Sequence, residues 1–287
     1  MPTTPSPLRY PGGKTKLYDY VKNILKTNNL LGETYIEPFA GGAGLALKLL
    51  LNGDVKRILI NDYDPAIYAF WNCVLTQTDA LCELISNSDI SVDTWRTQKN
   101  IYEHQDISDE LSLAFATFFL NRTNVSGVIK GGLIGGIAQN GTYCMDARFN
   151  KDSLIRKIER IALERDNIIL TNMDAFDFIQ ADHLRHYYKT FINFDPPYVN
   201  KGSQLYKNSF TEDDHRRLSK MISECHRKWI VTYDVCPLIA ELYAPFRRSE
   251  LDITYSACRT RRANEYIFFS PNLTLPDSIL IDFYKRK

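Results

Sequence analysis

Short apolar strands alternate with helices near the start of the chain. Thr34–Glu37 is expected to be a strand, and the glycine turn after it leads into an apolar helix over Leu45–Leu51. The β-branched run Val55–Ile60 predicts a second strand, after which Pro65 suits the first turn of a helix. This order predicts an α/β fold, with a largely parallel sheet and helices on both faces.

The same alternation returns after residue 150. Thr211 is a good helix cap because it precedes three acidic residues, which suit a helix N-terminus. The expected elements are helices over Leu154–Glu164 and Ala175–Leu184, a helix beginning at Thr211, and strands over Asn167–Thr171, Thr190–Phe194, Trp229–Tyr233 and Glu265–Ser270.

The middle of the chain lacks this alternation. Between residues 73 and 150 the clearest element is an apolar helix over Glu110–Asn121, and six of the fourteen glycines lie between 127 and 141. So many glycines indicate a loop whose backbone can approach another molecule closely, or else a mobile surface connection. We therefore expect one sheet domain, formed by residues 1–72 and 151–287, interrupted by a helical and loop-rich insert.

Composition narrows the class of protein. The chain has 287 residues, 44% of them hydrophobic, and no apolar run long enough for a membrane span. Its first residues lack the apolar centre of a secretory signal, so we expect a cytoplasmic protein. The six cysteines form no C-x-x-C pair, which favours reduced thiols and argues against a metal site.

Asp195-Pro196-Pro197-Tyr198 is the most informative tetrapeptide. It follows an apolar strand, and open α/β sheets bind ligands at the carboxyl ends of their strands. The prolines leave no N–H to occupy nearby carbonyls, so the turn can present a carboxylate and a carbonyl to a planar amino group. Tyr198 adds a flat face on which a base can stack. The alternative is a proline turn that only ends a strand.

A glycine-rich loop, Glu37–Gly44, follows the first strand. It is not a dinucleotide fingerprint, because Leu47 stands where the third glycine is required. Asp62, at the end of the second strand, can accept hydrogen bonds from two ribose hydroxyls, or it can cap the helix at Pro65. The glycine-rich loop together with Asp62 favours a cofactor that contains a nucleoside.

Two further sites each allow two interpretations. Gly12-Gly13-Lys14-Thr15 is not a phosphate loop, because Leu8 stands where its first glycine is required and no strand precedes it. A tight turn there can instead bring Tyr10 and Lys14 to a cofactor carboxylate. Asp174, after the third strand, can accept from an adenine amino group or cap the helix that begins at Ala175.

Together these segments resemble the DNA adenine-N6 methyltransferases of the Dam type (D12 class). The motifs occur in that family's order and span nearly the whole chain. They are Leu8–Lys14, Tyr35–Gly44, Asn61–Pro65, Phe118–Gly127, Arg148–Lys151, Asp195–Tyr198 and Arg259–Glu265.

The resemblance implies a Rossmann-like methyltransferase sheet, S-adenosyl-L-methionine as the cofactor, and the N6 atom of a flipped adenine in double-stranded DNA as the acceptor. It makes 73–150 a target-recognition insert within a discontinuous catalytic domain. The catalytic residues it implies are Asp195, Pro196, Pro197 and Tyr198. The cofactor-binding residues are Tyr10, Gly12, Gly13, Lys14, Glu37, Phe39, Ala40, Gly41, Gly42, Gly44, Asp62, Tyr63, Asp174, Ala175 and Asp195.

Net charge is only +1, yet basic residues gather locally. The residues expected to contact DNA form two groups, of which a solvated charged face is the alternative interpretation. They are Arg259, Arg261 and Arg262 near the C-terminus, and Arg122, Asn124, Ser126 and Lys130 in the insert. A monomer is expected, with a restriction endonuclease as a possible companion.

Three other classes compete with this interpretation. A nicotinamide-dependent oxidoreductase shares the strand–helix opening but explains neither the Asp195 turn nor the missing glycine. An RNA or protein amide methyltransferase uses a similar turn, typically with asparagine where this chain has Asp195. A DNA-binding module without activity has no need of an intact turn and cofactor loop.

Overall fold

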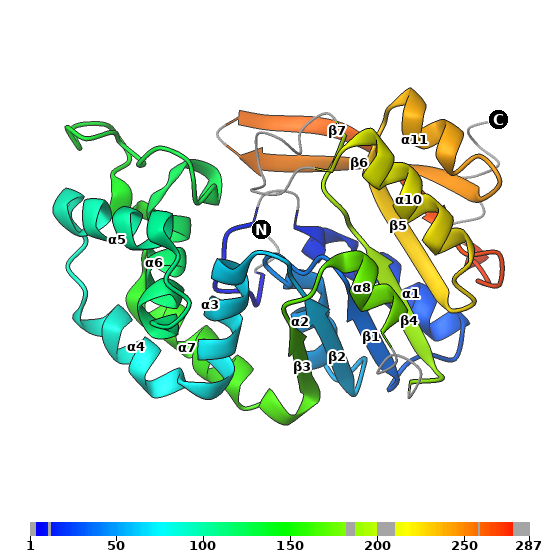
Figure 1. Ribbon diagram of the computed structural model, residues 1–287, viewed down its shortest axis with the longest axis horizontal. Helices are drawn as coiled ribbons and strands as arrows, with labels where there is room; N and C mark the ends of the chain where they lie inside the picture. Colours follow the sequence, from blue (N-terminus) through cyan, green and yellow to red (C-terminus); the bar gives the residue numbers. More distant parts are fainter. Residues whose placement is uncertain (1–3, 11–12, 182–186, 200–209, 258, 278–287) are drawn as a thin grey trace.

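A mixed seven-stranded sheet forms the centre of the protein (Figure 1). The computed structural model describes residues 4–10, 13–181, 187–199, 210–257 and 259–277, and only the backbone over 252–263. In spatial order the strands are β3 (Ile168–Thr171), β2 (Arg57–Asn61), β1 (Thr34–Glu37), β4 (Thr190–Phe194), β5 (Lys228–Asp234), β7 (Arg259–Phe269) and β6 (Arg247–Ala257).

The first five of these strands run parallel, whereas β7 lies antiparallel between β5 and β6. The chain proceeds outward from β1 in one direction to β2 and β3, and in the other to β4 and β5. Such a reversal of strand order opens a crevice beyond the carboxyl ends of the strands, where α/β proteins bind ligands. Here the crevice is flanked by the loops that follow β1 and β4.

Helices cover both faces of the sheet, as expected. Alternate residues of β1 belong to different cores: Tyr35 packs in one and Ile36 in the other, and both are fully buried. Tyr35 and Ile36 thus supply the apolar side chains that a strand buried on both faces requires. The α/β fold is therefore confirmed.

The helices divide between these two cores. The first core contains α1 (Tyr18–Thr27), α2 (Gly44–Leu51), α3 (Pro65–Thr76), α4 (Thr78–Asn87), α5 (Val92–His104), α6 (Glu110–Thr123) and α7 (Lys151–Ala162). The second contains α8 (Ala175–Gln180), α10 (Glu212–Ser223) and α11 (Pro237–Leu242). Short 3₁₀ turns lie at Lys14–Leu17 (η1), Val125–Gly127 (η2), Met145–Arg148 (η3) and Arg165–Asn167 (η4).

The helices α4, α5 and α6 of the insert gather with α3 and α7 beside the sheet (Figure 1). The rings of Phe70 on α3 and Phe118 on α6 stack with their centroids 5.8 Å apart, so the apolar core continues from the sheet helices into the insert. The division of the chain at residues 72 and 150 stays a prediction.

Most expected elements form close to their expected bounds. The Thr211 cap is a full capping box: its hydroxyl accepts from the amide of Asp214, whose carboxylate accepts from the amide of Thr211. The helix expected over Ala175–Leu184 ends at Gln180, and residues 182–186 lie outside the described part. The sequence analysis gave no bounds for α4, α5 or β6.

No helix among the described residues is long and apolar enough to cross a membrane.

Candidate active site

Asn61, the last residue of β2, joins the loops that follow three neighbouring strands. Its amide nitrogen donates to the carbonyls of Pro38 (3.1 Å) and Met173 (3.0 Å), and its oxygen accepts from the hydroxyl of Thr171 (2.7 Å). Asn61 is completely buried. Because a buried amide with all its bonds made fixes its partners, the loops at this edge of the sheet are held at a defined spacing.

The loop after β1 is built for close contact. Gly41 has φ +47°, and a Cβ there would lie 2.5 Å from the Tyr10 ring; a Cβ on Gly42 would lie 2.7 Å from Tyr10 Cβ. Trp71 Nε1 donates to the Gly41 carbonyl at 2.8 Å, which fixes the loop from below. Ala43 is left-handed at φ +46° and precedes α2 directly. Gly41 and Gly42 therefore have to be glycine, because Tyr10 of the Leu8–Lys14 segment lies against them.

Asp62 faces this glycine loop. Its carboxylate accepts from the amides of Gly41 (2.7 Å) and Asp64 (3.0 Å). The helix cap before Pro65 is Asp64, whose side chain accepts from the amide of Ala66, so the capping alternative for Asp62 is wrong. Burial raises the pKa of Asp62 to about 7.

The donor set at this edge fits a nucleoside-containing cofactor. The half-buried Asp62 carboxylate has no cation to pair with among the charges that shift its pKa, and ribose hydroxyls are neutral donors that suit such an acceptor. Tyr63 beside it has 54% of its surface exposed, and Phe39 is half-buried against Phe210 at 5.8 Å. Flat apolar groups therefore lie next to the carboxylate, as an adenosine moiety requires.

Other expected cofactor residues have structural tasks of their own. Glu37 is buried and accepts from the Tyr35 hydroxyl at 3.0 Å; burial raises its pKa to about 8, so it keeps its proton at neutral pH. Asp174 caps α8 by accepting from the amide of Phe176 at 2.8 Å. Ala40 and Ala175 are buried, Gly44 lies against the Thr15 side chain, Gly13 is exposed, and Gly12 lies outside the described residues.

The turn after β4 contains a compact group of polar side chains. Lys14 Nζ lies 2.9 Å from Asp195 Oδ1, 3.6 Å from Glu265 Oε2, and 2.8 Å from the Tyr198 hydroxyl, to which it donates. Thr232 on β5 donates its hydroxyl to Asp195 Oδ1 at 2.8 Å. In this structure Lys14 holds the carboxylate of the Asp195 turn, and the contact expected between Lys14 and a cofactor carboxylate stays a prediction.

Burial and charge oppose each other in this group. Burial raises the pKa of Asp195 above its ordinary value, although the Lys14 ammonium and the Thr232 hydroxyl counteract part of the rise. Burial alone would lower the pKa of Lys14, but Asp195 and Glu265 outweigh it and hold that pKa above its ordinary value. Lys14 is thus a firmly charged ammonium at the base of the turn.

Aromatic rings enclose the other side of the turn. The Tyr198 ring lies with its centroid 6.2 Å from that of Tyr233, whose hydroxyl is 2.8 Å from His215 Nδ1. Pro196 is buried, whereas Pro197 and Tyr198 are half-buried, so the outer part of the turn remains open to a ligand. The turn thus offers a carboxylate, a carbonyl and a half-open aromatic face close together.

The comparisons with known proteins identify the family. Residues 10–257 match the family described as D12 class N6 adenine-specific DNA methyltransferase. The chain belongs to this family. The protein is therefore an adenine-specific DNA methyltransferase that uses S-adenosyl-L-methionine, and the oxidoreductase, the RNA or protein methyltransferase and the inactive module are set aside.

Two relatives resemble this D12 methyltransferase over most of their length. The type II methyltransferase M.MjaIII of Methanocaldococcus jannaschii is 25% identical over 77% of this chain and 80% of its own. The type II methyltransferase M.CviBI of Paramecium bursaria Chlorella virus NC1A is 23% identical over 86% of this chain and 90% of its own. Among solved structures, the rRNA methyltransferase aviRa from Streptomyces viridochromogenes aligns with 91% of this chain and 85% of its own, at 14% identity and a TM-score of 0.39.

Asn121 joins the first motif of this methyltransferase to the insert. Its oxygen accepts from the Arg9 amide at 2.7 Å, and its nitrogen donates to the carbonyls of Arg9 (2.8 Å) and Gly127 (2.9 Å). Asn124 is also completely buried: it accepts from Trp95 Nε1 at 2.7 Å and donates to the Ile129 carbonyl at 2.7 Å. The DNA contact expected of the Asn124 side chain is therefore corrected to a structural task, because both ends of its amide are used inside the protein.

Arg122 binds main-chain carbonyls. Its Nε donates to the Arg148 carbonyl at 2.7 Å and its Nη1 to the Pro7 carbonyl at 3.3 Å. Burial, together with the neighbouring Arg9 and Arg148, lowers the pKa of Arg122 from its ordinary value. The Arg148 side chain is exposed. Arg122 thus braces the N-terminal segment inside a positively charged region.

The remaining expected DNA residues lie on two separate elements. Lys130 is exposed in the loop after α6, and Ser126 in the same loop has φ +60°. Arg259, Arg261 and Arg262 lie on β7 in the far half of the hairpin with β6, and their side chains lie outside the described part.

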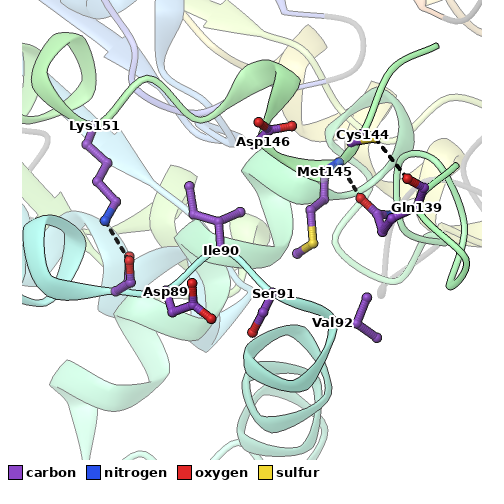
Figure 2. Close-up of a pocket in the computed structure, with 10 residues that line it drawn as sticks. Asp89, Ile90, Ser91, Val92, Gln139, Cys144, Met145, Asp146 and Lys151 are labelled. Carbon is purple, nitrogen blue, oxygen red and sulfur yellow. Dashed lines mark hydrogen bonds between the residues drawn. The ribbon is translucent and has the colours of Figure 1, made fainter. Parts of the chain in front are cut away.

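The glycine-rich loop of the insert has defined internal bonds. Gln139 accepts from the amide of Met145 at 2.9 Å and donates to the Ile134 carbonyl at 2.7 Å, while the Cys144 thiol donates to the Gln139 carbonyl. These residues border an open cavity of about 520 Å³ at the junction of α4 and α5, where Lys151 donates to the Ser88 carbonyl (Figure 2). These bonds are internal to the loop, and both expectations for it, close approach to another molecule and a mobile connection, stay predictions.

Three residues of this site were missed or left without a role by the sequence interpretation. Thr232 lies inside a strand read only as apolar. Glu265 and Asn121 were included in motifs without a function of their own. The signal available was at Thr232, where a polar side chain interrupts an apolar strand.

Proposed function

We propose that this enzyme methylates a specific adenine in double-stranded DNA, and that the adenine amino group binds at the Asp195–Tyr198 turn. The observation that carries the proposal is the position of Asp195 Oδ1, which Lys14 holds at 2.9 Å and Thr232 at 2.8 Å at the carboxyl end of β4. A carboxylate fixed from two sides presents its remaining lone pairs in a defined direction. Such preorganisation is what stabilises a transition state.

The adenine amino nitrogen is a poor nucleophile because its lone pair is delocalised into the ring. Asp195 and the carbonyl of Pro196 each accept one N6–H bond, which favours a more tetrahedral nitrogen. When bound, S-adenosyl-L-methionine would supply an electrophilic methyl group for transfer to N6, and its sulfur would keep the electron pair of the broken carbon–sulfur bond. Asp195 then receives the excess proton of N6 and releases it to water, a task that suits a carboxyl whose pKa burial has raised.

The target base has to leave the DNA stack to reach this turn, at a cost of a few kcal/mol. The half-open Tyr198 ring receives the base by stacking, and Lys14 fixes the Tyr198 hydroxyl. Asp62 would accept from the ribose hydroxyls of the cofactor. The loop from Phe39 to Gly44 would hold its methionine portion, since Gly41 and Gly42 leave the backbone accessible and Tyr10 packs against them.

DNA binding is proposed for the insert over 73–150 and the β6–β7 hairpin. Arg148 and Lys130 are exposed cations on the insert, and Arg259, Arg261 and Arg262 belong to the hairpin. Arg122 supports the phosphate-binding surface through the Arg148 carbonyl rather than by direct contact. Because phosphate contacts release counterions, these residues should determine the salt dependence of binding.

The type II relatives suggest a restriction–modification setting, with a cognate endonuclease that cuts the unmethylated site. We propose a cytoplasmic monomer, because the DNA substrate lies there and one chain carries both halves of the site.

Transfer of a tritiated methyl group tests this proposal. The purified chain is incubated with labelled S-adenosyl-L-methionine and with duplex DNA, RNA or protein as the acceptor. We expect label in the duplex alone and none with Asp195→Asn, which keeps the shape of the side chain and loses its charge. Equal labelling by Asp195→Asn would contradict the role given to the carboxylate.

A further inference from the structure

The polar group behind the Asp195 turn contains one carboxylate more than the proposed chemistry uses. Glu265 lies on β7 with 1% of its surface exposed, and its Oε2 is 3.6 Å from Lys14 Nζ. Lys14 therefore lies between two carboxylates, Asp195 on one side and Glu265 on the other. Asp195 binds the adenine in the proposed function, whereas Glu265 has no task there.

Burying an ionised carboxylate such as that of Glu265 lowers the stability of the folded protein. Removing an ionised group from water costs several kcal/mol unless a counter-charge and hydrogen bonds compensate for it. Glu37, buried at the same edge of the sheet, avoids this cost by keeping its proton, since burial raises its pKa to about 8. Glu265 instead forms an ion pair with a lysine that already has a partner. A glutamine of the same shape would spare the protein that cost.

The backbone around Glu265 is fixed from both sides. Glu265 pairs with Asp234 of β5 and with Leu251 of β6, so β7 lies inside the sheet rather than at an edge. Functional groups held on interior strands are placed more precisely than groups on loops. Glu265 can therefore determine where the Lys14 ammonium lies.

The charges of the three groups explain why a second carboxylate is useful. Lys14 and Asp195 alone would cancel, leaving a neutral pair beside the adenine. When all three groups are ionised, the cluster with Glu265 carries one net negative charge. Methyl transfer brings a positive charge onto N6, next to Asp195, and a net negative cluster stabilises that charge better than a neutral pair does.

We propose that Glu265 is a positioning residue for adenine methylation, which holds Lys14 and offsets its charge so that the cluster of Lys14, Asp195 and Glu265 presents a net negative charge to the amino group. This inference deepens the proposed function and rests on it. The lysine and the two carboxylates act as one unit.

The test compares Glu265→Gln and Glu265→Asp with the wild-type chain. Asp54→Asn is the matched control, because Asp54 is a buried carboxylate that pairs with Lys22 at 2.9 Å and lies at the opposite end of β2. The first readout is the titration of Asp195 in cofactor-free protein labelled with ¹³C-aspartate, with its signal assigned by loss in Asp195→Asn. The negative charge of Glu265 raises the pKa of Asp195, so that pKa should fall in Glu265→Gln and stay unchanged in Asp54→Asn.

The second readout is steady-state methylation of duplex DNA. Loss of one oriented charge should lower kcat of Glu265→Gln roughly 10- to 100-fold, the order seen when one stabilising group is removed from an active site. The KM values for DNA and cofactor should stay within about threefold, because substrates are bound elsewhere. Glu265→Asp keeps the charge and should recover much of kcat. It also decides the matter if the glutamine variant does not fold, since the proposal then requires Asp195 to titrate near its wild-type pKa.

An unchanged kcat and an unchanged Asp195 titration in Glu265→Gln would overturn the inference, as would a rise in KM at constant kcat. The two proposals fail separately. A wild-type chain that labels no adenine refutes the proposed function, while the titration still shows whether Glu265 and Asp195 are coupled through Lys14.

Discussion

Thr232 offers the cleanest perturbation of the Asp195 turn. Its side chain is fully buried on β5, and its hydroxyl donates to Asp195 Oδ1 at 2.8 Å. Thr232→Val removes this donor while nearly preserving the volume of the side chain. The carboxylate then loses one of its two fixed partners and keeps Lys14.

The magnitude follows from the charge of the acceptor. A hydrogen bond to an ionised group contributes about 1.5–3 kcal/mol, so the free energy of unfolding should fall by that order at neutral pH. The hydroxyl lowers the pKa of Asp195, and its loss should therefore raise that pKa further above the ordinary value of 3.8.

The sign of the pH dependence follows from the same shift. A carboxyl whose folded pKa is raised stabilises the protein below its unfolded pKa, and this contribution is lost as pH rises through the folded pKa. Because Thr232→Val raises the folded pKa, the extra loss of stability should be full where Asp195 is ionised. It should shrink as pH falls toward the ordinary value of 3.8, where Asp195 carries its proton.

Urea unfolding of the wild-type chain and of Thr232→Val, from acidic to slightly basic pH, measures this loss of stability. The pH profile of kcat measures the shift in the pKa of Asp195. The acidic limb of kcat should move to higher pH in Thr232→Val, opposite to its movement in Glu265→Gln. Thr232→Ser keeps the hydroxyl and should retain the wild-type limb. The reasoning fails if Thr232→Val loses the same stability at every pH, or if its limb coincides with that of the wild-type enzyme.

Three further predictions concern the cofactor loop and DNA. Gly41→Ala places a Cβ 2.5 Å from the Tyr10 ring and should weaken cofactor binding, measured by calorimetry, at least about tenfold. Gly53→Ala is the control: Gly53 also has a positive φ but has open space around it, so its substitution should lower only stability. Equal cofactor affinities of the two variants would refute this prediction. Because the pKa of Asp62 is about 7, cofactor affinity should rise as pH increases from acidic to basic through that value, and Asp62→Asn should bind weakly without this rise. Arg148→Ala should reduce the slope of log Kd for DNA against log salt concentration by about 1, and an unchanged slope would exclude a phosphate contact.

The sequence predicted those parts of the site that are local in the chain. The Asp195 turn and the glycine loop each follow an apolar strand, and residues next to a strand end need no knowledge of the fold to be placed at the edge of the sheet. The sequence left Asp62 with two roles, ribose binding or capping of the helix at Pro65, and only hydrogen-bond geometry shows that Asp64 is the cap.

Contacts between distant segments were beyond local patterns. Lys14 in η1 meets Asp195 after β4, a contact between distant segments that depends on how the N-terminal part of the chain packs. The sequence also did not show which polar residues at the end of α6 point inward. Asn121 and Asn124 are buried, although the surrounding sequence resembles a DNA-contacting loop. An asparagine satisfies either environment, so its burial depends on packing that the local sequence does not encode.

The most direct test of the account is the chemical identity of the product. Duplex DNA is incubated with S-adenosyl-L-methionine and either the wild-type chain or Asp195→Ala, digested to nucleosides, and analysed by mass spectrometry. The account predicts N6-methyladenine from the wild-type chain and none from Asp195→Ala, which should remain folded and retain some DNA binding. N6-methyladenine at the wild-type rate from Asp195→Ala, or methylation of another base by the wild-type chain, would contradict it.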